Sequence, residues 1–256
     1  MRTEHHEECK TNLMMLARKN TMKNLLKDFW DKCVDLGHPR ACAVCGDRLA
    51  IAERLLCGNC NFKLTRTYYW KNAKDNEMAK AFWVHIPVER AAAWFFHLPH
   101  TNESQLIYRL KYGEQPEIGE KMGRVAAGEF QESGFFEGVD AIIPVPLTKK
   151  RKRERGYNQS MEIARGVRKA TGIPIWGKVL KRKTFAGSQT RKDRRARHDN
   201  VEGAFVLRKG VSLEGKHLLI VDDVVTTGAT VIACAKELMK GGNIKVSVLS
   251  LGFAKG

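Results

Sequence analysis

The chain has 256 residues, of which 43% are hydrophobic and 29% charged, and its formal net charge is +17. This length is sufficient for one α/β domain and a smaller module, since single domains commonly hold roughly 100–200 residues. No run of about 18 apolar residues is present, which argues against a membrane span. The first residues carry acids and histidines instead of the basic start and apolar stretch of an export signal. The sequence therefore predicts a cytoplasmic protein, in which cysteines serve as metal ligands or structural thiols.

Most of the positive charge lies in two segments. Residues 149–155 carry six bases and one acid, and residues 178–199 carry nine bases and two acids. Charge runs usually face water, so two solvated loops are one interpretation. The other interpretation is binding to a polyanionic partner such as phosphate, nucleic acid or an acidic membrane.

The N-terminal part of the chain predicts a leader and a helix. Residues 1–21 show no clear periodicity, whereas apolar residues recur every three or four positions across residues 25–34. That spacing is typical of an amphipathic helix that packs on other elements. We assign residues 1–40 to this leader and helix.

Four cysteines follow with the spacing C-x2-C-x11-C-x2-C, namely Cys42, Cys45, Cys57 and Cys60. Each C-x2-C pair can form a tight turn that directs two sulfurs toward one ion, and the spacing is close to that of four-thiolate zinc sites. In so short a stretch, bound zinc takes the place of a hydrophobic core. We predict a structural zinc module over residues 41–72, with free thiols as the alternative.

After a polar connector over residues 69–80, strand patterns alternate with helix patterns. The predicted strands cover residues 88–97, 140–146, 173–180, 203–207, 217–221 and 244–251. The predicted helices cover residues 103–111, 117–131, 157–170 and 229–240. This alternation predicts an α/β domain with a mainly parallel sheet over residues 85–256. Ligands of such sheets bind at the carboxyl ends of the strands.

The segment LLIVDDVVTTGAT, residues 218–230, joins a buried strand to a helix through a threonine and glycine loop. Unpaired N–H groups and the helix dipole at such a helix start attract phosphate. The preceding carboxylates, Asp222 and Asp223, need hydrogen-bond donors as partners, and a sugar diol supplies them. A ligand with a phosphate at one end and a free diol in the middle is a ribose 5-phosphate.

At these residues the chain resembles the phosphoribosyl pyrophosphate loop of the type I phosphoribosyltransferases. The resemblance implies that Asp222 and Asp223 are the catalytic acids and hold the 2′ and 3′ hydroxyls of the ribose, with Mg2+ on the pyrophosphate. It implies that the 5-phosphate is bound by Thr226, Thr227, Gly228, Ala229 and Thr230. It places the pyrophosphate at Val145, Pro146, Leu147 and Thr148. A mobile loop that closes over the site would contain Gln189, Arg191 and Arg194.

The order of motifs along the chain resembles the ComF-like proteins of bacteria. The cysteine module is followed by RLKYG at residues 109–113, IIPVPLTKKRKRERGYNQS at residues 142–160, TFAGSQTRKDRRARHDNVEGAFVL at residues 184–207 and then the acid loop. The implied fold is a Rossmann-like, mainly parallel sheet of the type I phosphoribosyltransferase kind with an N-terminal zinc module.

This resemblance implies transfer of a phosphoribosyl group to an acceptor, which the sequence does not identify. Residues 94–97 and 108–112 are candidates to cover the site. Two alternatives stay open. Because the family is linked to DNA uptake in natural transformation, one is a protein that binds single-stranded DNA and the uptake machinery. The other is a sensor that binds phosphoribosyl pyrophosphate without turnover. A glutamine amidotransferase is disfavoured, since Cys9 does not occupy a processed terminus.

Overall fold

The computed structural model describes residues 40–99, 101–113, 115–183 and 203–254. The chain divides into two compact units, Met1–Gly58 and Asn59–Gly256, which are taken in turn. The packing helix predicted over residues 25–34 lies outside the described residues. So do the predicted mobile-loop residues Gln189, Arg191 and Arg194.

The described part of the first unit, residues 40–58, is held by short-range bonds. Ala41 and Arg48 form an antiparallel bridge. The Glu53 carboxylate accepts the backbone N–H groups of Ala50 at 2.7 Å and Gly58 at 2.6 Å, so one side chain ties two turns together. These contacts fold the chain back on itself between the two C-x2-C pairs.

A four-stranded parallel sheet forms the centre of the second unit, with strand order β1-β6-β5-β2. The strands are β1 (Arg90–Phe96), β2 (Ala141–Pro144), β5 (His217–Val225) and β6 (Lys245–Phe253). They are nearly continuous apolar runs, as expected for a sheet buried on both faces. A separate antiparallel pair is formed by β3 (Leu180–Arg182) and β4 (Phe205–Leu207).

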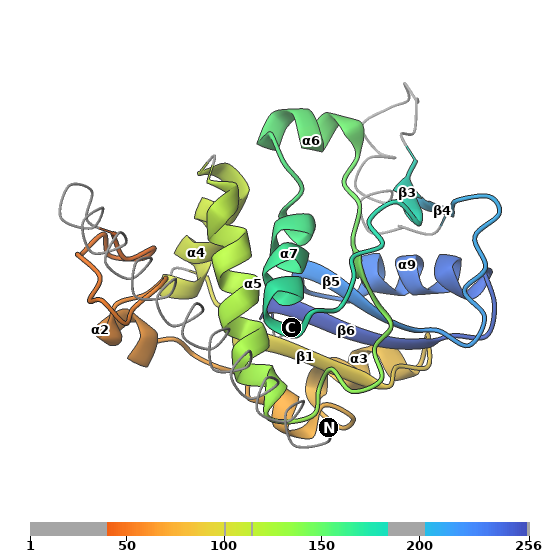
Figure 1. The fold of residues 1–256 in the computed structure, drawn as a ribbon, viewed down its shortest axis with the longest axis horizontal. Coiled ribbons are helices and arrows are strands. Elements are labelled where there is room, and N and C mark those ends of the chain that lie inside the picture. Colours follow the sequence, from red (N-terminus) through yellow and green to blue (C-terminus); the bar gives the residue numbers. More distant parts are fainter. Residues whose placement is uncertain (1–39, 100, 114, 184–202, 255–256) are drawn as a thin grey trace, which may run out of the picture. The chain divides into compact units, whose positions relative to one another are not determined.

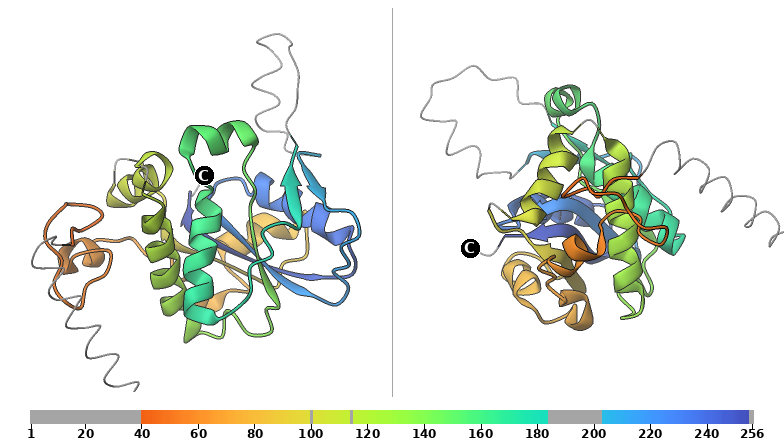
Figure 2. Two further views of the ribbon diagram at one scale, coloured as in Figure 1. Left: turned by 45° about the horizontal axis from the view of Figure 1, so that its top comes forward. Right: turned by 90° about the vertical axis from the view of Figure 1, so that its left-hand side faces the viewer.

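Helices cover both faces of the sheet (Figures 1 and 2). Those on its faces are α3 (Glu77–Trp83), α5 (Pro116–Gln131), α7 (Gln159–Thr171) and α9 (Ala229–Met239). The other helices of the described residues are α2 (Gly58–Phe62), η1 (Tyr69–Asn72), α4 (Asn102–Tyr112) and α6 (Lys149–Arg155). The buried residues of α3 and α9 share one apolar cluster with alternate residues of the strands. Helices α5 and α7 lie side by side against the other face. The sheet is thus the middle of three layers, and the α/β class is confirmed.

Two glycines allow α5 and α7 to approach backbone to backbone. A Cβ added to Gly123 would overlap the main chain of Ile163, and one added to Gly166 would overlap the main chain of Glu120 and Arg124. Only the absence of a side chain permits this contact. The contact fixes α7 against α5 and, with it, the residues that begin α7.

The structure differs from the sequence prediction in three elements. The strand expected over residues 173–180 is mostly absent: Ile175 makes an isolated parallel bridge with Ile142 and a turn follows it before β3 begins. The connector over residues 69–80 contains η1 and the start of α3, where the Asn76 side chain accepts the N–H of Ala79 at 2.9 Å. The basic run over residues 149–155 is a helix, α6, instead of a loop. Its charges lack the apolar periodicity that reveals a packed helix.

Among the residues that the structure describes, no helix has both the length and the apolar character needed to cross a membrane.

Candidate functional site

The acid pair lies within strand β5 and not after it. The predicted end of this strand at Val221 is wrong, because pairing with β6 continues to Val225. The neighbouring strand β2 ends earlier, where Pro144 pairs with Val221. Asp222 is therefore the first residue of β5 without a β2 partner, at the carboxyl edge of the sheet where ligands of such folds bind.

The Asp222 carboxylate is held from the start of α7 and by the neighbouring main chain. Its Oδ1 accepts the Ser160 hydroxyl at 3.0 Å and the N–H of Asp223 at 2.9 Å. Burial and the adjacent Asp223 charge raise the pKa of Asp222 to about 7, although these two hydrogen bonds and Lys111 act in the opposite direction. Asp222 therefore holds a proton more readily than an ordinary aspartate.

Asp223 has a different partner. Its Oδ2 lies 3.3 Å from the Lys111 Nζ, and its Oδ1 accepts the N–H of Val224 at 2.7 Å. Both side chains of the ion pair are largely shielded, with 24% of Lys111 and 15% of Asp223 exposed. Because Lys111 comes from α4, a cation far away in sequence balances one of the two adjacent carboxylates.

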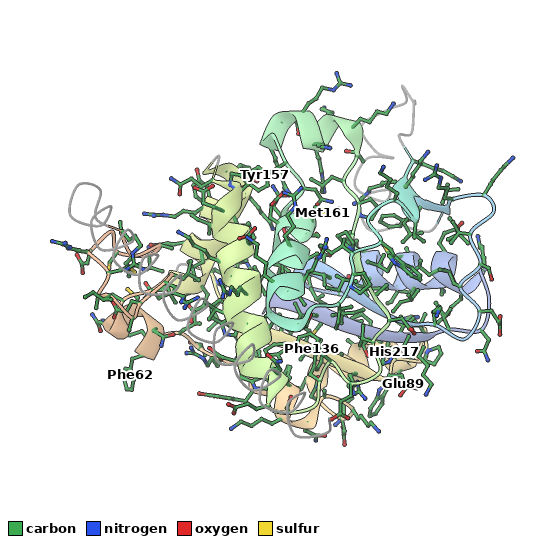
Figure 3. All side chains as sticks on the ribbon, in the orientation of Figure 1. Phe62, Glu89, Phe136, Tyr157, Met161 and His217 are labelled. Carbon is green, nitrogen blue, oxygen red and sulfur yellow. The ribbon has the colours of Figure 1, made fainter. Side chains whose placement is uncertain are left out.

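The segment that begins α7 connects three parts of the site. The Tyr157 hydroxyl donates to the Leu110 carbonyl of α4 at 2.6 Å, and the Asn158 amide donates to the Val145 carbonyl at 3.0 Å. Ser160, two residues further, reaches Asp222. Figure 3 shows Tyr157 and Met161 at this end of α7, away from His217 and Glu89 at the opposite edge of the sheet.

Two polar atoms in this segment lack partners among the described residues. They are Asn158 Oδ1 and Gln159 Nε2, both inaccessible to solvent. A buried polar atom without a hydrogen bond is unfavourable. The start of α7 therefore retains hydrogen-bonding capacity beside the acid pair.

The threonine and glycine loop leads directly into α9. Thr226 and Thr227 are exposed, so their hydroxyls are accessible to a ligand. Gly228 precedes the first helical residue with φ of 77° and provides no side-chain cap for the N–H groups of the first turn. An added Cβ there would lie 2.8 Å from the Phe82 ring. A left-handed, side-chain-free residue is needed at this point. The Thr227 hydroxyl accepts the N–H of Ala229 at 3.4 Å, and the next N–H groups of the first turn, which Gly228 does not cap, suit an anion.

The residues predicted to hold pyrophosphate follow the adjacent strand, β2. Val145 is still paired, donating its N–H to the Val221 carbonyl at 3.0 Å, while Pro146 and Leu147 are partly exposed. The Thr148 hydroxyl caps α6 by accepting the N–H of Arg151 at 3.2 Å. Because β2 and β5 are neighbouring parallel strands, the loop over residues 145–148 and the acid pair lie at the same edge of the sheet.

The sequence interpretation included Lys111 only in the segment 108–112 expected to cover the site, and it assigned no role to Asn158 or Ser160. All three lie inside motifs quoted above, RLKYG and the GYNQS end of the basic motif. Their contacts join residues 13 positions apart for Asn158 and Val145, 62 for Ser160 and Asp222, and 112 for Lys111 and Asp223. A local sequence pattern does not predict contacts between residues so far apart in the chain.

The four cysteines form a compact cluster. The sulfurs of Cys42, Cys45, Cys57 and Cys60 all lie within 4.8 Å of one another, and those of Cys45 and Cys57 are 3.7 Å apart. Zinc bound tetrahedrally at about 2.3 Å would separate neighbouring sulfurs by about 3.8 Å. The donor set and its spacing therefore fit a metal ion such as zinc.

Backbone donors support the ionised form of one of these thiols. The N–H groups of Cys57 and Val44 point to the Cys42 sulfur at 3.3 Å and 3.5 Å. Burial raises the pKa of Cys42, but these hydrogen bonds and the contact with Cys45 outweigh it and bring the pKa to about 7. A thiolate is the form that binds metal.

Known proteins share sequence and fold with this chain. The phosphoribosyl transferase domain family matches residues 111–254. The DNA utilization protein YhgH of Escherichia coli O157:H7 is 29% identical over 219 residues, which is 84% of this chain and 91% of that protein. Competence protein F of Haemophilus influenzae is 27% identical over 221 residues, covering 83% and 96%. A solved structure of glutamine phosphoribosylpyrophosphate amidotransferase from B. subtilis is 22% identical, covers 56% of this chain and 30% of its own, and has a TM-score of 0.36.

Proposed function

Because the chain belongs to the phosphoribosyl transferase domain family and is ComF-like, we propose that it binds phosphoribosyl pyrophosphate with Mg2+ and transfers the phosphoribosyl group to an acceptor. The observation that carries this proposal is the acid pair. Two adjacent carboxylates lie at the edge of the sheet, where Asp222 accepts a hydrogen bond from Ser160 and Asp223 pairs with Lys111. Helix α9, which follows them, has no side-chain cap from its N-cap residue Gly228.

In the proposed complex each part of the ligand has its own group of residues. Asp222 and Asp223 accept hydrogen bonds from the two ribose hydroxyls. The first turn of α9 and the loop before it hold the 5-phosphate, and residues 145–148 hold the pyrophosphate. Mg2+, when bound, would neutralise charge on the pyrophosphate oxygens. The protein then acts mainly by positioning the ribose carbon that is attacked.

Isothermal titration calorimetry with phosphoribosyl pyrophosphate and Mg2+ tests this proposal. We expect the native protein to bind, and Asp222→Asn and Asp223→Asn each to weaken binding by about 10- to 100-fold, because each removes a charged hydrogen-bond acceptor. Asp75→Asn is the matched control, since this carboxylate is 60% exposed and pairs with Lys80. Absence of binding by the native protein would reject the proposal.

Turnover separates a transferase from a sensor. Pyrophosphate release in the presence of acceptor compounds, measured with native protein and with the Asp222→Asn variant, supports transfer. Tight binding without pyrophosphate release for any acceptor supports the sensor.

A second candidate function is binding of single-stranded DNA, favoured by helix α6 and by the names of the relatives. No residue of α6 is buried, and six of its seven residues are basic. An exposed basic helix of this kind neutralises phosphates. Relatives are called a DNA utilization protein and a competence protein.

Fluorescence anisotropy with a labelled single strand tests this second function. Changing Lys149, Lys150, Lys152 and Arg153 to Gln should reduce the dependence of log affinity on log salt by about 3, since each phosphate contact contributes about 0.7 for single strands. The same number of changes among exposed bases of α5 and α7 is the control: Lys121, Arg124, Arg168 and Lys169. Equal effects of the two sets would contradict a role for α6.

A further inference from the structure

An open cavity of about 530 Å³ lies along α4, and its lining includes Lys111, the ion-pair partner of Asp223. Its lining includes His97, which follows β1, and Tyr108, Arg109, Lys111 and Tyr112 of α4. Cavities that bind small molecules commonly measure about 300–1,000 Å³. The proposed function leaves its acceptor without a site, and this cavity has a suitable size.

Lys111 connects the cavity to the acid pair. Its side chain lines the cavity, and its Nζ lies 3.3 Å from the Asp223 carboxylate. A molecule in the cavity would therefore lie next to the carboxylates proposed to hold the ribose.

The charge of the lining selects the kind of molecule. Arg109 and Lys111 are both basic, and no carboxylate lines the cavity among the residues that the structure describes. Lys111 is already paired with Asp223, so Arg109 is the lining cation available to a ligand. An arginine fork suits a carboxylate, which favours a ligand that carries negative charge.

Two tyrosines provide flat surfaces at the same cavity. Tyr108 and Tyr112 are 64% and 60% exposed, and their ring centroids are 5.0 Å apart. The Arg155 guanidinium lies 5.7 Å from the Tyr112 ring centroid, which helps to hold that ring in place. The two ring planes are inclined by 44°, so a planar ligand can stack on one ring and contact the edge of the other.

His97 offers an adjustable polar contact. Its Nδ1 is buried and has no hydrogen-bond partner among the described residues. The imidazole is therefore not fixed by a bond at Nδ1, and this atom keeps its hydrogen-bonding capacity. Burial first, and the nearby Lys111 charge second, lower the pKa of His97, so the neutral ring can both donate and accept.

We propose that this cavity binds the acceptor and that the acceptor is a planar aromatic acid. Its ring stacks on one of Tyr108 and Tyr112 and contacts the edge of the other. Its carboxylate meets Arg109 beside Lys111, and a polar ring atom meets His97. This inference rests on the proposed transferase function. In the transfer, the nucleophilic atom of the acceptor forms a bond to the ribose C1 while the bond from C1 to the pyrophosphate oxygen breaks. Pyrophosphate takes the electron pair, and any proton on the nucleophile passes to water.

Calorimetry with pairs of compounds that differ chiefly by a carboxylate tests the inference. Phosphoribosyl pyrophosphate and Mg2+ are titrated first, and the loaded full-length protein then receives nicotinate or nicotinamide, orotate or uracil, and anthranilate or aniline. We expect at least one acid to bind about tenfold or more tightly than its neutral partner. Arg109→Gln should abolish this preference, while Lys121→Gln, which alters an exposed base on α5, should keep it.

Two further variants separate stacking from charge. Tyr108→Ala and Tyr112→Ala should weaken the acid and its neutral partner by the same factor, about five- to tenfold, because the ring contact is common to both. If the loaded protein shows no preference for any acid, or if the preference survives Arg109→Gln, the inference is wrong. If phosphoribosyl pyrophosphate itself does not bind in the first titration, the proposed function fails and the inference fails with it.

Discussion

The cysteine cluster and the acid pair are two sites built in opposite ways. The four cysteines lie within residues 42–60, and their sulfurs come within 4.8 Å of one another through tight local turns. The acid pair is adjacent in sequence, but its partners Lys111 and Ser160 come from α4 and α7. A metal site of this kind needs little more than its own segment, whereas the carboxylate site needs the whole sheet and its helices.

This difference affects how each site tolerates change. Zinc would supply most of the folding free energy of a segment as short as the cysteine cluster. The acid pair gains its geometry from packing, such as the close contact of α5 and α7 that positions Ser160. The predictions below test this contrast, beginning with the largest effect.

Loss of one cysteine should remove the metal almost entirely. We expect native protein to contain close to one equivalent of zinc and Cys57→Ser to contain less than about one tenth, since structural zinc sites bind with about 10–16 kcal/mol and depend on all four ligands. Metal analysis by mass spectrometry measures this. Cys234→Ala, which removes a buried thiol outside the cluster, should keep the zinc. Freshly purified native protein with less than about half an equivalent would count against the site.

Gly228→Ala should lower the free energy of unfolding by about 2–4 kcal/mol. The substitution adds a Cβ at φ of 77° and places it against the Phe82 ring. Gly215→Ala is the matched control, since Gly215 has φ of 70° with no atom within 4 Å of an added Cβ. It should cost only about 1–2 kcal/mol. Urea unfolding measures both, and equal losses would show that the contact with α3 does not constrain the loop.

Asp222 should make the unliganded protein less stable as the pH rises from about 4 to about 7. The pKa of its carboxyl is raised from 3.8 to about 7 in the folded protein, so over this range the folded state keeps a proton that the unfolded chain has lost. We expect a decline of about 1–2 kcal/mol from this group, less than full burial would give because the side chain is partly exposed.

Urea unfolding across this pH range checks the effect of Asp222. Asp222→Asn should flatten the dependence of the free energy of unfolding on pH, and the exposed Asp75→Asn should leave it unchanged. Parallel curves for the native protein and Asp222→Asn would contradict the raised pKa.

Ser160→Ala should produce the smallest change. It removes one hydrogen bond to Asp222 and should weaken phosphoribosyl pyrophosphate binding by about 3- to 10-fold, or about 1 kcal/mol. Ser133→Ala serves as the control, because its hydroxyl donates to the Phe130 carbonyl at the end of α5. Calorimetry compares the two variants, and an effect of Ser133→Ala as large as that of Ser160→Ala would mean that α7 does not support the acid pair.

Much of the fold follows from patterns in the sequence. The apolar runs that became β1, β5 and β6 and the helical periodicity of α5 and α7 are local properties, and their alternation predicts a parallel sheet. The segment over residues 173–180 was predicted wrongly because its apolar residues pack along the edge of β2 without forming a regular strand. Helix α6 was not predicted because it has no buried face, so its sequence shows no apolar residues at helical spacing.

Local order in the sequence was sufficient to predict the four-cysteine cluster, the acid pair and the loop before α9, since each is set by residues close together in the chain. The fold was needed to bring Lys111 to Asp223, Ser160 to Asp222 and His97 beside the cavity along α4. The reason is physical. Spacing along the chain specifies turns, caps and periodic faces, but contacts between distant residues depend on which strands pair and how closely helices pack.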